Sequence, residues 1–284
     1  NIAVNQQVFQ DTRFNFFIVH TDEDFRAGLN SFIHSTIKTF LILANRSVRF
    51  EQQSFQATPE LINFTVVAGD SITFDLCSFA YSNVNTMSLF TNNSIVFDQQ
   101  SFEETKSLNN FTAHAPNGIT YGLDSFKGSN ISQIIIQSSG SISFNQQSFK
   151  ACKGLKRFSI LSSSIISFES KSFEMSQIEE LIISQNNELK TQNQNDESSA
   201  FVNFEKDSFN ECSKLKKIEI STKGTVNIKK ESFENNNQLE SLRIHADQSI
   251  VVESNAFLGC DSLKIKEIDS PDTKVDDCAF GDCK

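Results

Sequence analysis

Residues 94–113, SIVFDQQSFEETKSLNNFTA, contain the motif that decides the fold, because versions of it recur along the whole chain. The fixed point of the motif is Phe102, the phenylalanine of a Ser-Phe pair, and we call this position the anchor. Equivalent anchors follow one another at intervals of 23 or 24 residues, with one interval of 36: Phe9, Phe32, Phe55, Phe79, Phe126, Phe149, Phe173, Phe209, Phe233, Phe257 and Phe280. A period in the range of about 20 to 29 residues predicts a solenoid, in which each coil buries its apolar face against its neighbours.

Each coil contains the pattern of two short strands. After the anchor comes an alternating run such as LINFTV at 61–66 or LKKIEI at 215–220, and the alternation predicts a half-buried strand. A turn rich in Gly, Asn, Asp and Ser follows, then a second alternating run such as SIVF at 94–97. We interpret the polar segment before the next anchor as a short helical or 3₁₀ turn. The sequence therefore predicts a mainly β leucine-rich-repeat solenoid of about twelve 23–24-residue coils, with two parallel sheets and short helical turns.

The phenylalanine content predicts how the core is filled. The chain has 28 Phe, no Trp and two Tyr. Besides the anchors, one set lies five residues before an anchor (Phe50, Phe74, Phe97, Phe144, Phe168, Phe204) and another shares a third column (Phe17, Phe40, Phe64, Phe111, Phe158). Stacked coils would place ring over ring, so we expect a Phe-rich core.

We expect residues 1–284 to form a single solenoid domain of a longer protein, because the chain begins within a coil. The long interval between anchors places an insertion at about 184–200, SQNNELKTQNQNDESSA, which we expect to be a surface spacer, with a binding or processing loop as the alternative. Residues 258–284 are a candidate C-terminal cap.

Composition excludes several classes of function. A net charge of −10 and a pI near 5.0 argue against nucleic acid or an anionic membrane as partner. No run of 18 apolar residues is present, so we expect no direct membrane insertion. His20, His114 and His245 share a column but lie several coils apart, and no phosphate loop, CxxC or HExxH motif occurs. We therefore expect no catalytic residue, no metal and no cofactor.

Small residues occupy a further column, three residues after each anchor. It contains Thr12, Ser35, Thr58, Ser82, Thr105, Ser129, Cys152, Ser176, Cys212, Asn236, Cys260 and Cys283. This restriction predicts a tight, buried position whose side chains bond to neighbouring backbone, so we expect its cysteines to be structural rather than reactive. Since only adjacent coils bring cysteines within bonding distance, a disulfide is expected only among Cys260, Cys278 and Cys283.

The segments SFNECSKLKKIEI (208–220) and AFLGCDSLKIKEI (256–268) resemble the BspA-like class of leucine-rich repeats. In the N-terminal coils Ser or Thr replaces the Cys of this pattern, and residues 263–268 fit it loosely. Proteins of this class are known from the surfaces of anaerobic bacteria and parasitic protists, where they are linked to adhesion to host proteins and cells. The resemblance implies a curved, right-handed solenoid with a binding role at the cell surface or outside the cell, and it carries over no catalytic residue.

The variable positions around the first strand of each coil are the candidate binding residues, because they would line an exposed sheet. In the N-terminal half they are uncharged or apolar, apart from one lysine: Phe16, Ile18, Lys38, Leu41, Ile62, Asn63, Thr65, Asn85, Ser88, Asn110 and Thr112. Such a surface suits a protein partner or a second copy of the chain. The alternative is that a coil preceding residue 1 covers Phe16 and Ile18.

The same positions are charged in the C-terminal half, and the signs alternate between neighbouring coils. We expect Lys156 beside Glu179, Arg157 beside Glu180, and Glu219 beside Arg243. Opposite charges on adjacent strands largely cancel one another's field, so we interpret this half as structural.

Five N-x-S/T sequons, at Asn45, Asn63, Asn92, Asn110 and Asn130, fall at positions expected to be exposed. They are compatible with N-glycosylation, although chance alone would give about as many. Together these features predict a non-enzymatic cell-surface or secreted module that binds proteins or cell-surface ligands. The alternative is a structural protein that assembles through its ends or sheets into extracellular fibres or a surface coat.

Overall fold

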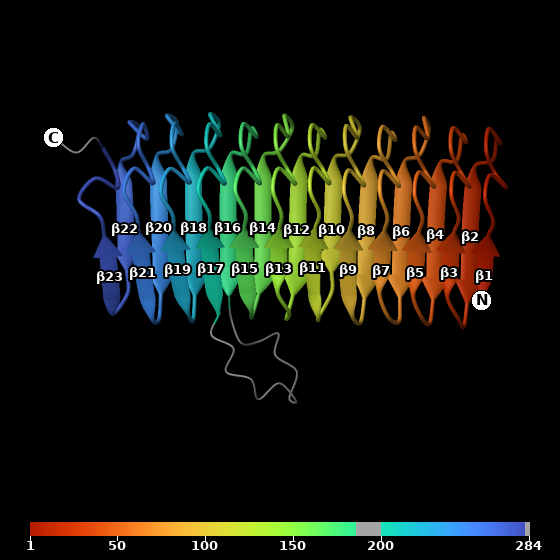
Figure 1. The fold of residues 1–284 in the computed structure, drawn as a ribbon, viewed down its shortest axis with the longest axis horizontal. Helices are drawn as coiled ribbons and strands as arrows, with labels where there is room; N and C mark the ends of the chain where they lie inside the picture. The colour runs from red at the N-terminus through yellow and green to blue at the C-terminus, as the bar shows by residue number, and fades with distance from the viewer. Residues whose placement is uncertain (186–199, 282–284) are drawn as a thin grey trace.

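The computed structural model describes residues 1–185 and 200–281, and every helix or strand in these ranges is a β-strand. The strands form two parallel sheets that run the length of the molecule (Figure 1). The 12-stranded odd sheet comprises β1 (Ile2–Val4), β3 (Phe25–Ala27), β5 (Val48–Phe50), β7 (Ile72–Phe74), β9 (Ser94–Phe97), β11 (Gly118–Tyr121), β13 (Ile142–Phe144), β15 (Ile165–Phe168), β17 (Phe201–Phe204), β19 (Thr225–Ile228), β21 (Ser249–Val252) and β23 (Asp272–Val275). The 11-stranded even sheet comprises β2 (Phe16–Thr21), β4 (Thr39–Ala44), β6 (Asn63–Ala68), β8 (Thr86–Thr91), β10 (Asn110–His114), β12 (Gln133–Ser138), β14 (Arg157–Ser162), β16 (Glu180–Gln185), β18 (Lys217–Thr222), β20 (Ser241–Ala246) and β22 (Ile265–Asp269). The predicted solenoid of two parallel sheets is confirmed.

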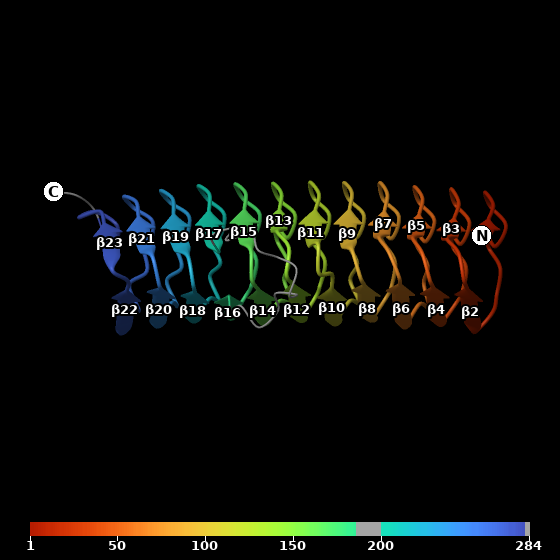
Figure 2. The ribbon, with the colours of Figure 1, turned by 90° about the horizontal axis from the view of Figure 1, so that it is seen from below.

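Each coil gives one strand to each sheet, and the two sheets lie as separate layers with the core between them (Figure 2). Equivalent residues of successive coils pair directly, as Phe40 does with Phe64 in the even sheet. The insertion expected at about 184–200 begins in β16, and its residues 186–199 lie outside the described residues.

Stacked aromatic rings fill the core along three columns, as the sequence predicts. In the anchor column the ring centroids of Phe55 and Phe79 lie 4.6 Å apart with an interplanar angle of 6°. In the column on the odd sheet Phe74 and Phe97 are 5.0 Å apart at 2°. Edge-to-face contacts join the columns, such as the 4.7 Å contact of Phe64 with Phe79. The rings are buried, so apolar burial and offset stacking both stabilise the stack.

The helical turn expected before the anchor is wrong, because the backbone is left-handed two residues before the anchor and again two residues after it. In the coil of Phe55 these are Gln53, with φ of 56°, and Ala57, with φ of 52°. The positions two residues before and two residues after the anchor have positive φ in every coil from Phe9 to Phe257, and only Gly128 and Gly259 among them are glycines. A right-handed helix of L-residues cannot contain such residues.

This left-handed geometry turns backbone groups toward the next coil. The N–H groups of Gln53, Phe55 and Ala57 donate to carbonyls of the following coil, with N–O distances of 3.3, 2.7 and 3.0 Å. The anchor segments therefore form a third inter-coil ladder beside the two sheets.

The expected curvature is also absent, since the coils stack in a nearly straight row in both views (Figures 1 and 2). A solenoid bends when one side of each coil is wider than the other. Here hydrogen-bonded ladders on all sides space the coils at about 4.8 Å, so no side is wider.

The predicted column of small residues is buried from Ser35 to Cys260, and most of its side chains bond to backbone carbonyls, as expected. The Ser176 hydroxyl donates to the carbonyl oxygens of Phe173 and Phe149, at 2.6 and 3.2 Å. Asn236 bridges two coils in the same way, from Nδ2 to the carbonyl oxygens of Phe209 and Phe233. From Cys152 onward these side chains therefore tie an anchor segment to the coil before it, whereas Thr58 and Thr105 bond only to the carbonyl of their own anchor.

A second serine column, directly before the anchor, behaves differently. Its hydroxyls are buried, and none has a hydrogen-bond partner among the described residues: Ser31, Ser54, Ser78, Ser101, Ser125, Ser148, Ser172, Ser208 and Ser232. Alanine takes this position at Ala256 and Ala279. Small size, rather than hydrogen bonding, explains the residue type there.

Exchanging serine for alanine at either position of one coil should distinguish the roles of the two columns of small residues. We expect Ser172→Ala to be neutral or to raise the free energy of unfolding by up to about 1 kcal/mol, because a buried hydroxyl without a partner is removed. Ser176→Ala should lower it by about 1–2 kcal/mol, because two carbonyl groups lose a donor. Urea unfolding of both variants measures the difference, and equal effects would contradict this assignment.

A glycine exchange tests the left-handed backbone. Ala57→Gly should raise the free energy of unfolding by up to about 1 kcal/mol, because the left-handed region is strained for alanine and open to glycine. The neighbouring Ala80 is buried and its φ is not positive, so Ala80→Gly should instead be destabilising by about 1 kcal/mol. Thermal and urea unfolding report both; a destabilised Ala57→Gly protein would show that this position does not need a left-handed conformation.

Candidate functional site

The outer surface of the even sheet changes character halfway along the solenoid. Strands β2, β4, β6, β8, β10 and β12 each present three outward positions, and none of these carries Asp, Glu, Lys or Arg. We call the outward residues of these six strands the uncharged face. Parallel pairing from Phe16 on β2 to Gln133 on β12 keeps the positions in straight rows.

Apolar side chains on this face are exposed. Phe16 is 68% exposed and Ile18 is 63% exposed, on the edge strand β2. Ile62, just before β6, is also exposed, whereas Leu41 is half-buried. The other predicted binding residues lie on or beside the same rows: Asn63 and Thr65 on β6, Ser88 on β8, Asn110 and Thr112 on β10, with Lys38 and Asn85 directly before β4 and β8.

Sequence reasoning missed one row of the face. Leu43, Val67 and Phe90 lie outward on the adjacent strands β4, β6 and β8, and their exposed fractions are 37%, 40% and 39%. The signal was present as continued alternation in FLILA (40–44) and FTVVA (64–68), two residues beyond the predicted end of the strand. With this row the face has a continuous apolar strip.

The C-terminal half of the even sheet is charged, and its charges are paired. Arg157 lies 3.2 Å from Glu180 on the neighbouring strand, as expected. Glu219 opposes Arg243 in register but pairs with Lys217 at 2.7 Å, while Arg243 pairs with Glu267 at 2.9 Å. The expected neighbours Glu219 and Arg243 are thus confirmed, although each forms its ion pair with a different residue. A shallow groove of about 390 Å³ crosses this region, and ion-paired side chains line it.

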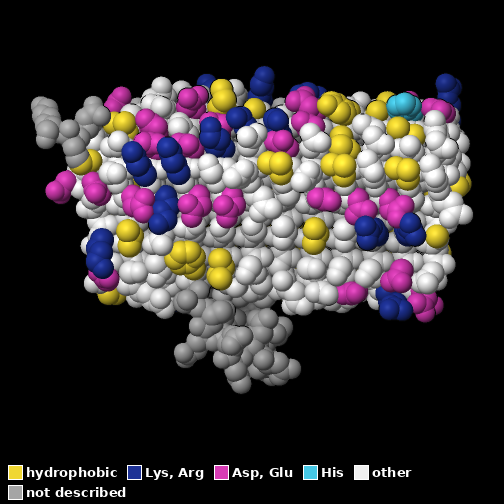
Figure 3. All heavy atoms as spheres, in the orientation of Figure 1, with side chains coloured by type: hydrophobic (Ala, Val, Ile, Leu, Met, Phe, Trp, Pro, Cys, Tyr) yellow, Lys and Arg dark blue, Asp and Glu magenta, His cyan; other side chains and the backbone are white. Residues whose placement is uncertain are grey.

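On the odd sheet the outward strand positions from Thr73 to Val251 also carry no Asp, Glu, Lys or Arg, and the charges lie on strands near the two ends of the sheet and directly after the strands. The residue directly after the strand is acidic in seven coils: Glu51, Asp75, Asp98, Glu169, Glu205, Glu253 and Asp276. Some of these pair with cations, as Asp75 does with Arg49 at 3.0 Å and Glu253 with Lys229 at 3.0 Å. Figure 3 shows charged side chains in rows along the face that it presents, with apolar side chains scattered among them.

A scan against protein-family models matches the BspA type leucine-rich repeat region, with 6 copies, over residues 72–199 and 191–284. The chain belongs to the BspA-type leucine-rich-repeat family. Repeats of this family generally mediate protein interactions on a non-enzymatic scaffold, and the family is generally associated with bacterial surface proteins. A comparison with curated proteins finds no match. The BspA-type match begins at Ile72, yet β2, β4 and β6 before it continue the same register.

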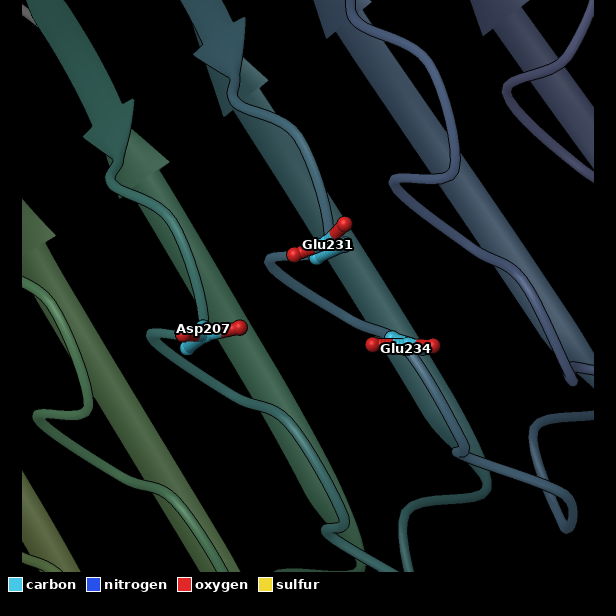
Figure 4. A group of neighbouring side chains, drawn as sticks. All are labelled: Asp207, Glu231 and Glu234. Carbon is cyan, nitrogen blue, oxygen red and sulfur yellow. The ribbon is translucent and has the colours of Figure 1, made fainter.

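The one group of described residues that brings three potential metal ligands together is Asp207, Glu231 and Glu234, from adjacent coils (Figure 4). Lys206 and Lys230 contact Glu231 at 2.9 and 3.1 Å and lower the pKa of its carboxyl group. Partial burial and the neighbouring carboxylates raise the pKa of Glu234. The lysines thus compensate Glu231, while Glu234 lies close to the carboxylates of Glu231 and Asp207.

The histidine column lies on the even sheet, with His20 on β2, His114 on β10 and His245 on β20. His245 contacts Asp269 at 3.0 Å through Nδ1 and Asp247 at 3.1 Å through Nε2. These contacts join the last coils to one another, and the three histidines remain on strands too far apart to act together.

The five sequon asparagines are all exposed. Asn45 follows β4 and Asn92 follows β8, in equivalent turns, and Asn130 precedes β12. Asn63 and Asn110 lie on the uncharged face, separated by Thr86 on the intervening strand. Their glycosylation stays a prediction.

Four of the cysteines, Cys77, Cys152, Cys212 and Cys260, are free, whereas Cys278 is disulfide-bonded. Cys260 therefore takes no part in the bridge considered for the last coils, and Cys283 lies outside the described residues. The Cys152 sulfur donates to the carbonyl oxygen of Phe126 at 3.3 Å, and burial raises the pKa of this thiol to about 12.

The buried thiols should make stability depend on pH in the alkaline range. The Cys152 pKa is raised from 9.0 to about 12 in the fold, so the unfolded chain loses the proton first as pH rises and stability falls above pH 9. At pH 10 this lowers the free energy of unfolding by about 1.4 kcal/mol for one thiol. Comparing urea unfolding of the wild type with Cys152→Ser at pH 8 and pH 10 isolates this effect; parallel pH dependence would contradict it.

Proposed function

We propose that the protein is a non-enzymatic binding module of the cell surface or extracellular space, and that the uncharged face recognises a protein or another cell-surface ligand. The observation that supports this most is the absence of Asp, Glu, Lys and Arg from three outward positions on each of six consecutive strands. Charged residues make up 21% of the chain, and they take outward positions of the same sheet from Arg157 onward. The cores of protein interfaces are depleted of charge in the same way.

The size and shape of the face suit a protein partner. Six strands spaced at about 4.8 Å, with three outward positions each, offer roughly 500 Å² of flat surface. A standard interface uses about 800 Å² per partner, so the face and its margins can form most of one. The apolar strip of Leu43, Val67 and Phe90 would supply burial, and the hydroxyl and amide side chains beside it would supply hydrogen bonds.

The adhesive role rests on family membership together with this surface. The described residues contain no helix with the length and apolarity needed to cross a bilayer. We expect the ligand to be bound through surface contacts alone, without a cofactor. Assembly into fibres or a coat is the alternative function, and it would use the ends of the stack or a sheet face.

Two matched valine substitutions test the face. Val67 on the even sheet and Val96 on the odd sheet are both outward strand residues, with exposed fractions of 40% and 37%. We expect Val67→Glu to reduce binding of the labelled chain to cultured epithelial cells by about tenfold or more, because a charge enters the apolar strip. Val96→Glu should bind within about twofold of the wild type, since it lies outside the proposed interface.

Both variants should fold, because both positions are exposed, and circular dichroism checks this. Equal binding by the two variants would remove the uncharged face from consideration. A wild-type chain that binds neither cells nor immobilised extracellular-matrix proteins would contradict the adhesive role.

A further inference from the structure

A pocket of about 420 Å³ lies at the edge of the uncharged face, where strands β4, β6 and β8 run into the turns that follow them. One side of the pocket is formed by Val67 and Phe90, which belong to the apolar strip, and by His114, which follows Phe90 in register on β10. No Asp, Glu, Lys or Arg is among the described residues that line it. The pocket therefore combines apolar and neutral polar side chains in one hollow.

A glycine in the turn leaves room for this pocket. Asn45, Gly69 and Asn92 occupy the same turn position in three successive coils, and all three line the pocket. A Cβ atom on Gly69 would clash with the carbonyl oxygen of Asn45, so the close approach of the two backbones requires glycine there. The two asparagines thus flank a position without a side chain, and two coil spacings, about 9.6 Å, separate their backbones.

Hydrogen-bonding groups in the pocket are available to a ligand. Within the part of the chain that the structure describes, neither the exposed Asn92 side chain nor the His114 imidazole forms a hydrogen bond or an ion pair. The next asparagine along the chain differs, because Asn93 Oδ1 accepts a hydrogen bond from Asn117 Nδ2 at 3.0 Å. A free side-chain amide offers two donors and a carbonyl acceptor, and an imidazole adds one more group. The turn therefore fixes Asn93 and leaves Asn92 unpaired beside the pocket.

These groups fit a neutral sugar ring. A pyranose has a face of C–H groups and a rim of hydroxyls, so it needs an apolar surface and neutral hydrogen-bonding partners together. Phe90 is 39% exposed and supplies the surface, while Asn92 and His114 supply the partners. A phosphate or a carboxylated sugar would find no Lys or Arg among the described lining residues to compensate its charge. The volume of the pocket lies within the range of small-molecule sites.

We propose that this pocket binds a neutral hexose or N-acetylhexosamine residue of a cell-surface glycan. The proposal rests on the proposed function, because the pocket shares Val67 and Phe90 with the uncharged face and names the class of ligand that this face recognises. Asn45 and Asn92 are also sequon residues, and a glycan attached to Asn92 would fill the same space. The test therefore uses the full chain from a bacterial host that adds no N-glycans.

The chain is titrated by NMR with the methyl glycosides of galactose, glucose, mannose, N-acetylglucosamine and N-acetylgalactosamine. We expect at least one of them to bind with a dissociation constant of about 1 mM, and the anionic N-acetylneuraminic acid not to bind. Phe90→Ala should weaken binding by about tenfold or more, whereas Tyr81→Ala, at an exposed aromatic residue outside the pocket, should stay within about twofold. Asn92→Ala should weaken it by about fivefold, and Asn130→Ala, at another exposed sequon, should not change it.

A separate measurement distinguishes this proposal from the proposed function. Binding of the wild type to cultured epithelial cells is compared before and after enzymatic removal of their surface glycans, and we expect the removal to abolish it. Cell binding that survives the removal would assign the face to a protein, which overturns the sugar site and leaves the binding module intact. A wild type that binds none of the neutral glycosides, that binds N-acetylneuraminic acid equally well, or that loses as much affinity with Tyr81→Ala as with Phe90→Ala would also overturn the proposal. Glycoside binding without cell binding would contradict the adhesive role and support the sugar site.

Discussion

The structure depends on hydrogen bonds between coils that keep every equivalent residue in register. Two sheets provide two of the ladders, and the anchor segments provide the third, in which each anchor N–H donates to the residue before the next anchor at 2.6–2.8 Å. Because each coil advances by the same distance along all three ladders, side chains of one type meet in columns. The aromatic stacks, the small-residue columns and the straight shape all follow from this constraint.

This constraint explains which features could be predicted from the sequence. The period, the two strands per coil and the three Phe columns depend on hydrophobic alternation, which the sequence displays directly, and all of them were found. The left-handed positions could not be recognised, because residues as different as Gln53, Tyr81 and Met175 occupy them. Their conformation is stabilised by inter-coil hydrogen bonds rather than by local preference, so residue type there carries little information.

The candidate site shows the same division. The change from an uncharged to a charged half of the even sheet could be predicted, because it needs only the identity of outward residues. The row of Leu43, Val67 and Phe90 was missed because the strand continues past the expected turn, and strand ends are set by the ladder. Glu219 and Arg243 could be predicted as neighbours, but the ion pair of Arg243 with Glu267 could not, because register alone does not say which of two neighbouring carboxylates a long side chain reaches. A repeat pattern therefore predicts which residues are neighbours, but not which of these neighbours form ion pairs.

Faces and ends of this solenoid have different physical roles. A flat face can bind a partner while the ladders stay intact, because recognition there uses only outward side chains. An end presents unpaired strand edges and core rings, so association there extends the fold itself. Lys266 and Thr273 replace apolar residues at inward positions of the last described strands, whereas no charged residue interrupts the outward positions of the uncharged face. With a net charge of −10 concentrated on the other surfaces, a partner of the uncharged face would be held by short-range burial and hydrogen bonds rather than by the field of the protein. The distribution of charge therefore favours recognition through the outward side chains of this sheet face.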